Sequence, residues 1–267
     1  MVSIVRFQLG NEPSYGLLED GIVYAASGNP LRQMVEKTQA IGPLDSLTLY
    51  PPVAPSKIVA IGLNYLDHIT EDAPNFQQPE NPIIFLKPPS SLTGSGQPIV
   101  LPAGPEHVDS EAELVIVIGQ QARNVPDYQA HEYILGYTCG NDVSARDYQF
   151  KDGQWVRAKG FDTFTPLGPV IVTGLDPSNL AVTCRLNGEV RQSSSTAKLL
   201  FSVPYLVQFV SRVMTLEPGD VIMTGTPAHP PQMRVGDVVE VEIEGIGVLR
   251  NPVAAEGLAG GAGEVMH

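Results

Sequence analysis

The chain has 267 residues, 43% of them hydrophobic and 17% charged, and its 16 basic and 29 acidic residues give a formal net charge of -13. These totals predict a globular protein with a substantial core, and no apolar run is long enough for a transmembrane helix. The negative charge argues against nucleic acid and against an anionic membrane as partners. It permits an anionic small-molecule substrate, because a metal or a few cations can reverse the field locally.

Two features of the sequence predict a cytoplasmic protein. Residues 1–16 lack the charged start and the long apolar core of a signal peptide. The two cysteines, Cys139 and Cys184, do not have the spacing of a zinc or redox motif, so we expect buried thiols.

Residues 1–54 are predicted to form a small N-terminal domain. The stretches 3–9 and 14–26 are predicted as strands, the second interrupted by a turn at Glu19-Asp20-Gly21. Residues 30–42 have the pattern of a short helix that ends at a glycine. The proline-rich stretch 49–57 predicts a linker.

Residues 55–255 are predicted to form a larger catalytic domain that is mainly β with some α. Short apolar strands follow one another between turns, and a hairpin is expected over residues 180–192 with Asn187-Gly188 at its turn. Clear helical spacing occurs over residues 199–214. The Gly-rich tail, residues 256–267, is expected to be disordered.

Two glutamates precede a strongly apolar strand in "VDSEAELVIVIG", residues 108–119. Residues two apart on a strand face the same side, so Glu111 and Glu113 should project into one small volume and repel each other. Asp142 follows the strand "ILGYTCG" and joins them if the two strands pair. Three carboxylates suit Mg²⁺, or Mn²⁺, better than zinc. An isolated Glu-x-Glu is more often a solvated strand edge, so the metal needs further support.

His68 in "GLNYLDHITE", residues 62–71, is the candidate general base. Glu71 follows three residues later on the same side of a helical turn, where a carboxylate fixes the tautomer of the imidazole and raises its basicity. The alternative is a surface His–Glu pair at the start of a helix. The following stretch, residues 69–82, is rich in Pro, Asn and Gln and is a candidate lid.

With these segments the chain resembles the fumarylacetoacetate hydrolase family, in its branch of small bacterial and mitochondrial members. The resemblance covers roughly residues 57–253 and rests on the order and spacing of several segments, among them "FLKPPSSL", "GYTCGNDVSARDYQ", "RAKGFDTFTPLGP" and "GDVIMTGTP". It implies a mixed β-sheet roll, usually in a homodimer. It also implies a Mg²⁺ site built from Glu111, Glu113 and Asp142.

By the same matching, Lys159 is implied to be a catalytic residue near the metal. The substrate-binding residues implied are Arg146, Gln149 and Thr226. His68 and Glu71 match the pair that activates water in members that break carbon–carbon bonds. From the residues alone, Arg146 can also be a structural partner of the adjacent Asp147, and Thr226 can belong to a structural turn.

We therefore predict a Mg²⁺-dependent enzyme that breaks a C–C bond in small 2-oxo acids or diacids through a metal-stabilised enolate. Acylpyruvate-type hydrolysis and oxaloacetate-type decarboxylation are both open. The alternatives are an isomerase or decarboxylase of 5-carboxymethyl-2-hydroxymuconate or 2-hydroxyhepta-2,4-diene-1,7-dioate in aromatic catabolism, and a non-catalytic binder of Mg²⁺ and a dicarboxylate.

Two positions depart from the pattern of the family. His229-Pro230-Pro231 stand where small glycine-rich turns are common, which puts the size and specificity of the substrate in doubt. Ser110 stands where an aromatic residue is frequent, and strand alternation predicts that it faces away from the glutamates.

Overall fold

The structure is a computed structural model that describes residues 1–72 and 78–257, with the backbone alone for residues 71 and 72. The strands are β1 (Ser3–Leu9), β2 (Glu12–Glu19), β3 (Ile22–Ala26), β4 (Lys37–Pro43), β5 (Ile58–Gly62), β6 (Ile83–Lys87), β7 (Leu92–Gly94), β8 (Ile99–Leu101), β9 (Val108–Asp109), β10 (Ala112–Ile118), β11 (Ile134–Asn141), β12 (Ser144–Ala145), β13 (Thr165–Val172), β14 (Ala181–Leu186), β15 (Glu189–Ser195), β16 (Val221–Met223), β17 (Val238–Ile243) and β18 (Gly247–Ala255). The α-helices are α1 (Leu66–Asp72), α2 (Ala130–Tyr133), α3 (Arg146–Asp152), α4 (Val156–Lys159) and α5 (Val203–Val213).

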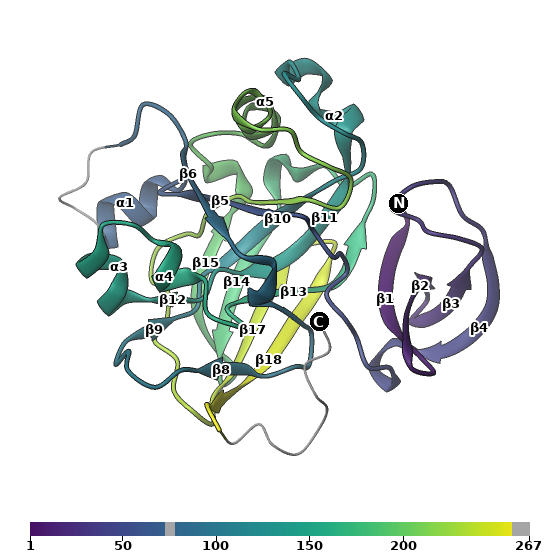
Figure 1. Cartoon of the computed structure of the whole chain (residues 1–267), viewed down its shortest axis with the longest axis horizontal. Coiled ribbons are helices and arrows are strands. Elements are labelled where there is room, and N and C mark those ends of the chain that lie inside the picture. The colour runs from purple at the N-terminus through teal and green to yellow at the C-terminus, as the bar shows by residue number, and fades with distance from the viewer. Residues whose placement is uncertain (73–77, 258–267) are drawn as a thin grey trace.

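The described residues form one 11-stranded mixed sheet, a second sheet of five strands and a small two-stranded sheet, β12-β9. The order in the first is β4-β3-β2-β1-β13-β11-β10-β16-β5-β6, with β7 beside β13, and in the second β15-β14-β17-β18-β8. The helices are few and short, and α1, α3 and α4 gather on the side of the molecule opposite β1–β4 (Figure 1). The predicted fold class, mainly β with some α, is confirmed.

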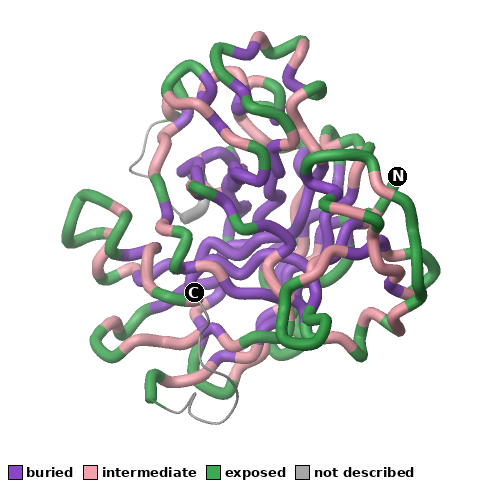
Figure 2. The backbone as a smooth tube through the Cα atoms, turned by 45° about the vertical axis from the view of Figure 1, so that its right-hand side comes forward, coloured by how far each residue is buried: buried purple, intermediate pink, exposed green. Residues whose placement is uncertain are grey.

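The core lies between the two sheets, and the buried backbone runs through the middle of the molecule in Figure 2. β10 is buried along its whole length, as its apolar sequence predicts. Its side chains alternate between two apolar clusters: Leu114 and Ile116 belong to one, and Val115 and Val117 to the other. The parity of β10 therefore places Glu113 on the face of Val115 and Val117.

The N-terminal strands continue the large sheet. β1 pairs with β13, with Ser3 opposite Val172, and the predicted turn at Asp20-Gly21 joins β2 to β3. Because one sheet runs through both predicted units, the division of the chain at residues 54–55 stays a prediction.

The helix predicted over residues 30–42 is wrong. After a turn, β4 pairs with the edge of β3 in the antiparallel sense. Met34 is 101% exposed, so it adds no buried apolar contact to this segment. The open edge of β3 instead satisfies the backbone hydrogen bonds of residues 37–43.

The hairpin predicted around Asn187-Gly188 and the helix predicted within residues 199–214 are both present, as β14–β15 and α5. No helix in the described part of the chain combines the length and apolarity needed to cross a bilayer. The predicted disordered tail lies outside the described residues from 258 onward.

β5 and β16 are parallel neighbours, and their starts are fastened together by Asp220. Its buried carboxylate accepts hydrogen bonds from Ser56 N and Ser56 Oγ, from Lys57 N and Lys57 Nζ, and from Glu217 N, at 2.5–3.1 Å. Burial opposes ionisation, but the bonds from Lys57, Glu217 and Ser56 lower the pKa of Asp220 below its usual value. This anchor fixes the register of two strands whose other ends carry residues 62–68 and 224–226.

We expect Asp220→Asn to lower the free energy of unfolding by about 2 kcal/mol at neutral pH, because an amide NH2 then faces Lys57 Nζ or the Glu217 N–H. A lowered pKa in the folded state stabilises the protein above about pH 4 and ceases to do so as the pH falls through the folded-state pKa. Urea titrations at several pH values should therefore show the difference from wild type shrinking in acid. The exposed Asp45→Asn is the control, and a pH-independent difference would contradict the assignment.

Candidate metal centre and active site

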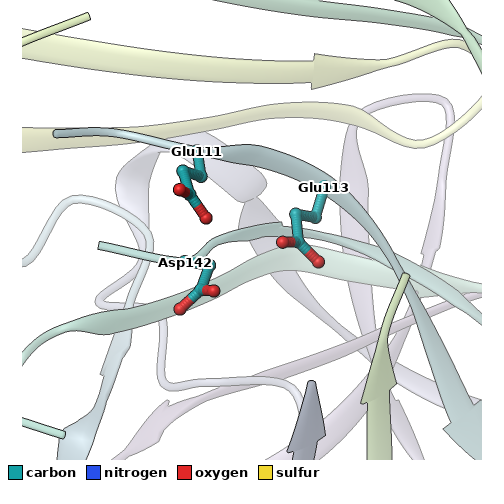
Figure 3. Close-up of side chains that lie close together, drawn as sticks. All are labelled: Glu111, Glu113 and Asp142. Atoms are coloured by element: carbon teal, nitrogen blue, oxygen red, sulfur yellow. The ribbon is translucent and has the colours of Figure 1, made fainter. Parts of the chain in front are cut away.

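Three buried carboxyl groups meet at the ends of β10 and β11. The two strands are antiparallel, with Ala112 opposite Asn141, so residues 111–113 lie beside residues 140–142. One carboxylate oxygen each of Glu111, Glu113 and Asp142 lie within 4.8 Å of one another. Figure 3 shows Glu111 and Glu113 reaching from one segment toward Asp142 on the next. The strand pairing predicted from the sequence is therefore present.

Backbone contacts hold the three acids in place. The Glu111 N–H donates to Asn141 Oδ1 at 2.9 Å, and the Asp142 N–H donates to the Glu111 carbonyl at 2.9 Å. The Gly225 N–H donates to Glu113 Oε2 at 2.8 Å. Gly225 has a φ of 101°, and a Cβ there would lie 2.9 Å from Asn64 Cβ, so glycine is needed for this approach.

Three cations contact two of the acids. Lys159 Nζ lies 2.9 Å from Glu111 Oε2 and 2.5 Å from Asp142 Oδ2. Arg146 places one guanidinium nitrogen 2.6 Å from Glu111 Oε1 and another 2.7 Å from Asp109 Oδ2. Lys87 Nζ lies 2.5 Å from Asp142 Oδ1 and donates to the Phe164 carbonyl at 2.7 Å. Among these groups, four carboxylates face three cations.

The pKa shifts of these buried groups follow from the excess of carboxylates over cations. Burial raises the pKa of Glu113 well above its usual value, and the charges of Asp142 and Glu111 raise it further. Burial also acts against ionised Glu111, but the ammonium of Lys159 and the guanidinium of Arg146 bring its pKa below the usual range. Burial lowers the pKa of Lys87, and Asp142 offsets this only in part.

The donor set fits a hard divalent cation. All three groups are oxygen donors, which Mg²⁺ and Mn²⁺ prefer. Among the described residues, Glu113 accepts one hydrogen bond from a neutral N–H and forms no ion pair. A cation beside Glu113 would relieve the repulsion that raises its pKa.

The other predicted residues surround a small cavity of about 30 Å³ beside the acids. It is lined by the three acids and Lys159, together with His68, Arg146, Gln149 and Thr226. His68 lies on α1, and Arg146 and Gln149 lie on α3, where Arg146 donates to Gln149 Oε1 at 2.7 Å. The side chain of Glu71 lies outside the described residues, and so does much of the candidate lid.

The alternative partner considered for Arg146 is not its partner. Asp147 Oδ2 instead accepts from the backbone N–H groups of Glu106 and His107 at 2.7 and 3.1 Å. Ser110, which departs from the family pattern, has its Oγ 3.6 Å from Cys184 Sγ on β14. Cys139 and Cys184 are both buried and free, as expected.

Lys87, Asp109 and Gln192 were not predicted from the sequence. Gln192 Nε2 donates to Thr226 Oγ1 at 2.9 Å while its Oε1 accepts from the Ala112 N–H at 3.0 Å, which ties the Thr226 hydroxyl to the start of β10. One feature of the sequence could have pointed to Lys87. It ends an apolar strand directly before Pro88-Pro89, where burial of the lysine would require a buried anionic partner.

Comparison with known proteins assigns the family. Residues 57–254 match the family described as fumarylacetoacetate (FAA) hydrolase C-terminal, and residues 3–52 match the one described as Rv2993c-like, N-terminal. The chain belongs to the fumarylacetoacetate hydrolase family. The resemblance predicted from the sequence is thereby confirmed, and the chain joins a family of enzymes that act on small molecules.

Individual relatives of this family differ in their reactions. The chain is 56% identical over 209 residues to an uncharacterized protein of Archaeoglobus fulgidus, covering 78% of this chain and 83% of the relative. It is 42% identical over 235 residues to the mitochondrial oxaloacetate tautomerase of Xenopus laevis, covering 83% and 73%. The crystal structure of a 5-carboxymethyl-2-hydroxymuconate delta-isomerase from Mycobacterium smegmatis superimposes with a TM-score of 0.88 at 45% identity, covering 95% of this chain and 100% of that one.

We expect Lys87→Met to lower the free energy of unfolding of the metal-free protein by about 3 kcal/mol, because it leaves a buried carboxylate with one cation fewer. The exposed Lys37, paired with Glu19, is the matched control, and Lys37→Met should leave stability nearly unchanged. Chemical denaturation of both variants measures the difference. Equal, small effects would show that Lys87 does not compensate Asp142.

Proposed function

We propose that the protein is a Mg²⁺-dependent enzyme that breaks the C3–C4 bond of small 2-oxo acids. The observation that supports this most strongly is the buried acid cluster, in which Glu113 has no cationic partner among the described contacts, next to a cavity that His68 also lines. Glu111, Glu113 and Asp142 are the proposed metal ligands. Mg²⁺, when bound, would supply a Lewis acid for the carboxylate and keto oxygens of a 2-oxo acid.

Other residues of the chain are proposed to bind the substrate and to stabilise the charge that develops on it. Lys159 and Arg146 carry positive charge at the cavity wall and are proposed to attract the substrate carboxylate and to stabilise the negative charge that develops on the keto oxygen. Gln149 and Thr226 are proposed to orient the substrate by hydrogen bonds. Because Gln192 holds Thr226 and Asp109 holds Arg146, both groups are set in place before the substrate arrives.

His68 is the proposed general base, with Glu71 as its orienting partner. In an acylpyruvate, His68 would take a proton from water as the water oxygen bonds to C4. The C3–C4 bond then breaks, its electron pair moves to C3 to give the enolate of pyruvate, and the group at C4 leaves as a carboxylic acid. A proton returns to C3. The atoms balance as acylpyruvate plus water giving pyruvate and the acid.

A second candidate is proton transfer without C–C cleavage. It is favoured by two relatives, because the Xenopus protein is called a tautomerase and the Mycobacterium smegmatis protein an isomerase. Both reactions need an enolate or enol of a 2-oxo acid, so the same acid cluster and cations would serve. The difference lies in whether His68 activates water or moves a proton on the substrate.

Proton NMR of metal-stripped protein, with and without added Mg²⁺, tests the proposal. With acetylpyruvate we expect Mg²⁺-dependent formation of pyruvate and acetate, and with oxaloacetate the formation of pyruvate faster than in a sample without enzyme identifies decarboxylation. Glu113→Gln should abolish the response to Mg²⁺, because it removes one of three anionic ligands. A moved double bond or faster enol–keto exchange with the carbon skeleton intact would favour the second candidate. Mg²⁺ binding without turnover of any of these compounds would favour a non-catalytic binder.

Replacement of His68 should separate chemistry from binding. We expect His68→Ala to lower kcat by about 100-fold or more while calorimetry shows Mg²⁺ binding retained. His131→Ala, on α2 and away from both cavities, is the control and should behave as wild type. Unchanged kcat in His68→Ala would remove this residue from the mechanism.

A further inference from the structure

A second, larger cavity adjoins the small one. Its volume is about 790 Å³, within the range of small-molecule sites. The two cavities share wall residues, including His68, Phe85 and Trp155, so they lie side by side. We call the larger cavity the vestibule. A ligand whose head lies beside the acid cluster must extend any remaining atoms into it.

The inner part of the vestibule is walled by apolar and aromatic side chains. Phe85 and Trp155 meet edge to face, with ring centroids 5.2 Å apart. Trp155 packs so tightly over Gly62 that a Cβ at Gly62 would lie 2.3 Å from its ring, which fixes the indole in place. Ile83 of β6 and Phe150 of α3 extend this wall.

The charged lining of the vestibule is already paired. Arg146 is the one Lys or Arg among the described residues that line it, and its guanidinium contacts the carboxylates of Asp109 and Glu111. His107 Nε2 lies 2.8 Å from Asp109 Oδ1. His229, from the segment that departs from the family pattern, also lines the vestibule, beside Pro230. A second carboxylate on a ligand would thus meet a guanidinium shared by two acids, in a protein of net charge -13.

We infer that the vestibule selects 2-oxo acids whose tail beyond C4 is neutral and apolar, and that it disfavours diacids. The inference rests on the proposed function, since it takes the 2-oxo acid head to lie beside the acid cluster. It narrows the substrate class from small 2-oxo acids and diacids to monoacids with an alkyl or aryl end. Apolar tails would gain by burial against Phe85, Trp155 and Ile83, whereas a terminal carboxylate would lose its hydration without a free cation.

Trp155 offers a direct test, because it is the single tryptophan of the chain and lines both cavities. Three 2-oxo acids without a C4 carbonyl serve as probes in fluorescence titrations with Mg²⁺ present. Pyruvate has the head and no tail. 5-Methyl-2-oxohexanoate and 2-oxoglutarate have the same number of heavy atoms and end in an isopropyl group and a carboxylate, respectively. We expect the isopropyl compound to bind at least about tenfold more tightly than 2-oxoglutarate.

A variant that adds a positive charge to the vestibule provides a second test. Phe150 is 80% exposed, so Phe150→Arg should fold normally and supply the free cation that the vestibule lacks. We expect it to shift the ratio of the two Kd values toward 2-oxoglutarate by about threefold to tenfold. Tyr128→Arg adds the same charge at a residue that is 73% exposed and lines neither cavity, and should leave the ratio unchanged.

The outcomes separate the inference from the proposed function. If pyruvate binds and 2-oxoglutarate binds as tightly as the isopropyl compound or more tightly, the head site stands and the inference is overturned. A loss of that 2-oxoglutarate affinity in His229→Leu would then identify the imidazole as the carboxylate partner. If no 2-oxo acid changes the fluorescence or shows a heat of binding in calorimetry, the proposed function fails and the inference fails with it.

Discussion

The burial of an excess negative charge organises this protein. Glu111, Glu113 and Asp142 lie within a few ångströms of one another in the interior, a placement that costs several kcal/mol unless opposite charges compensate it. Lys159, Arg146 and Lys87 provide that compensation for two of the acids and leave Glu113 without an ionic partner among the residues that the structure describes. The cluster therefore contains more negative than positive charge, which favours the binding of a divalent cation. A bound cation would in turn attract the carboxylate of a 2-oxo acid.

The architecture delivers these groups from distant parts of the sequence. β10 and β11 bring the acids together, while the parallel pair β5 and β16 carries residues 62–68 and 224–226 to the same place. Asp220 fastens the starts of that pair, and the Gly225 N–H reaches Glu113 from its end. Strand register thus determines the geometry of the site, because a slip of one residue would turn Glu113 away from the cluster.

The sequence was sufficient where a pattern is local and was insufficient where the partner is remote. The two-residue spacing of Glu111 and Glu113 before an apolar strand predicts a shared face, and Asp142 follows from one assumed strand pairing. Lys87 lies 55 residues from Asp142, and no local pattern connects them. The helix predicted at residues 30–42 was wrong for the same reason. β4 forms by pairing with the edge of β3, and the sequence of residues 30–42 contains no information about that edge. Glu71 as the partner of His68 stays a prediction.

Phe85 stands at the boundary between the two halves of the site. Its ring lies 5.1 Å from Lys159 Nζ on the charged side and meets Trp155 on the apolar side. The ring thus contacts both the charged cluster and the apolar wall, while the Arg146–Asp109 ion pair itself lines the vestibule. Charged and apolar groups are consequently adjacent. Under the proposed function, the cluster would bind the head of a 2-oxo acid and the vestibule wall would contact its tail. Changes at Phe150 or in residues 229–231 can therefore alter substrate choice while the acid cluster stays intact.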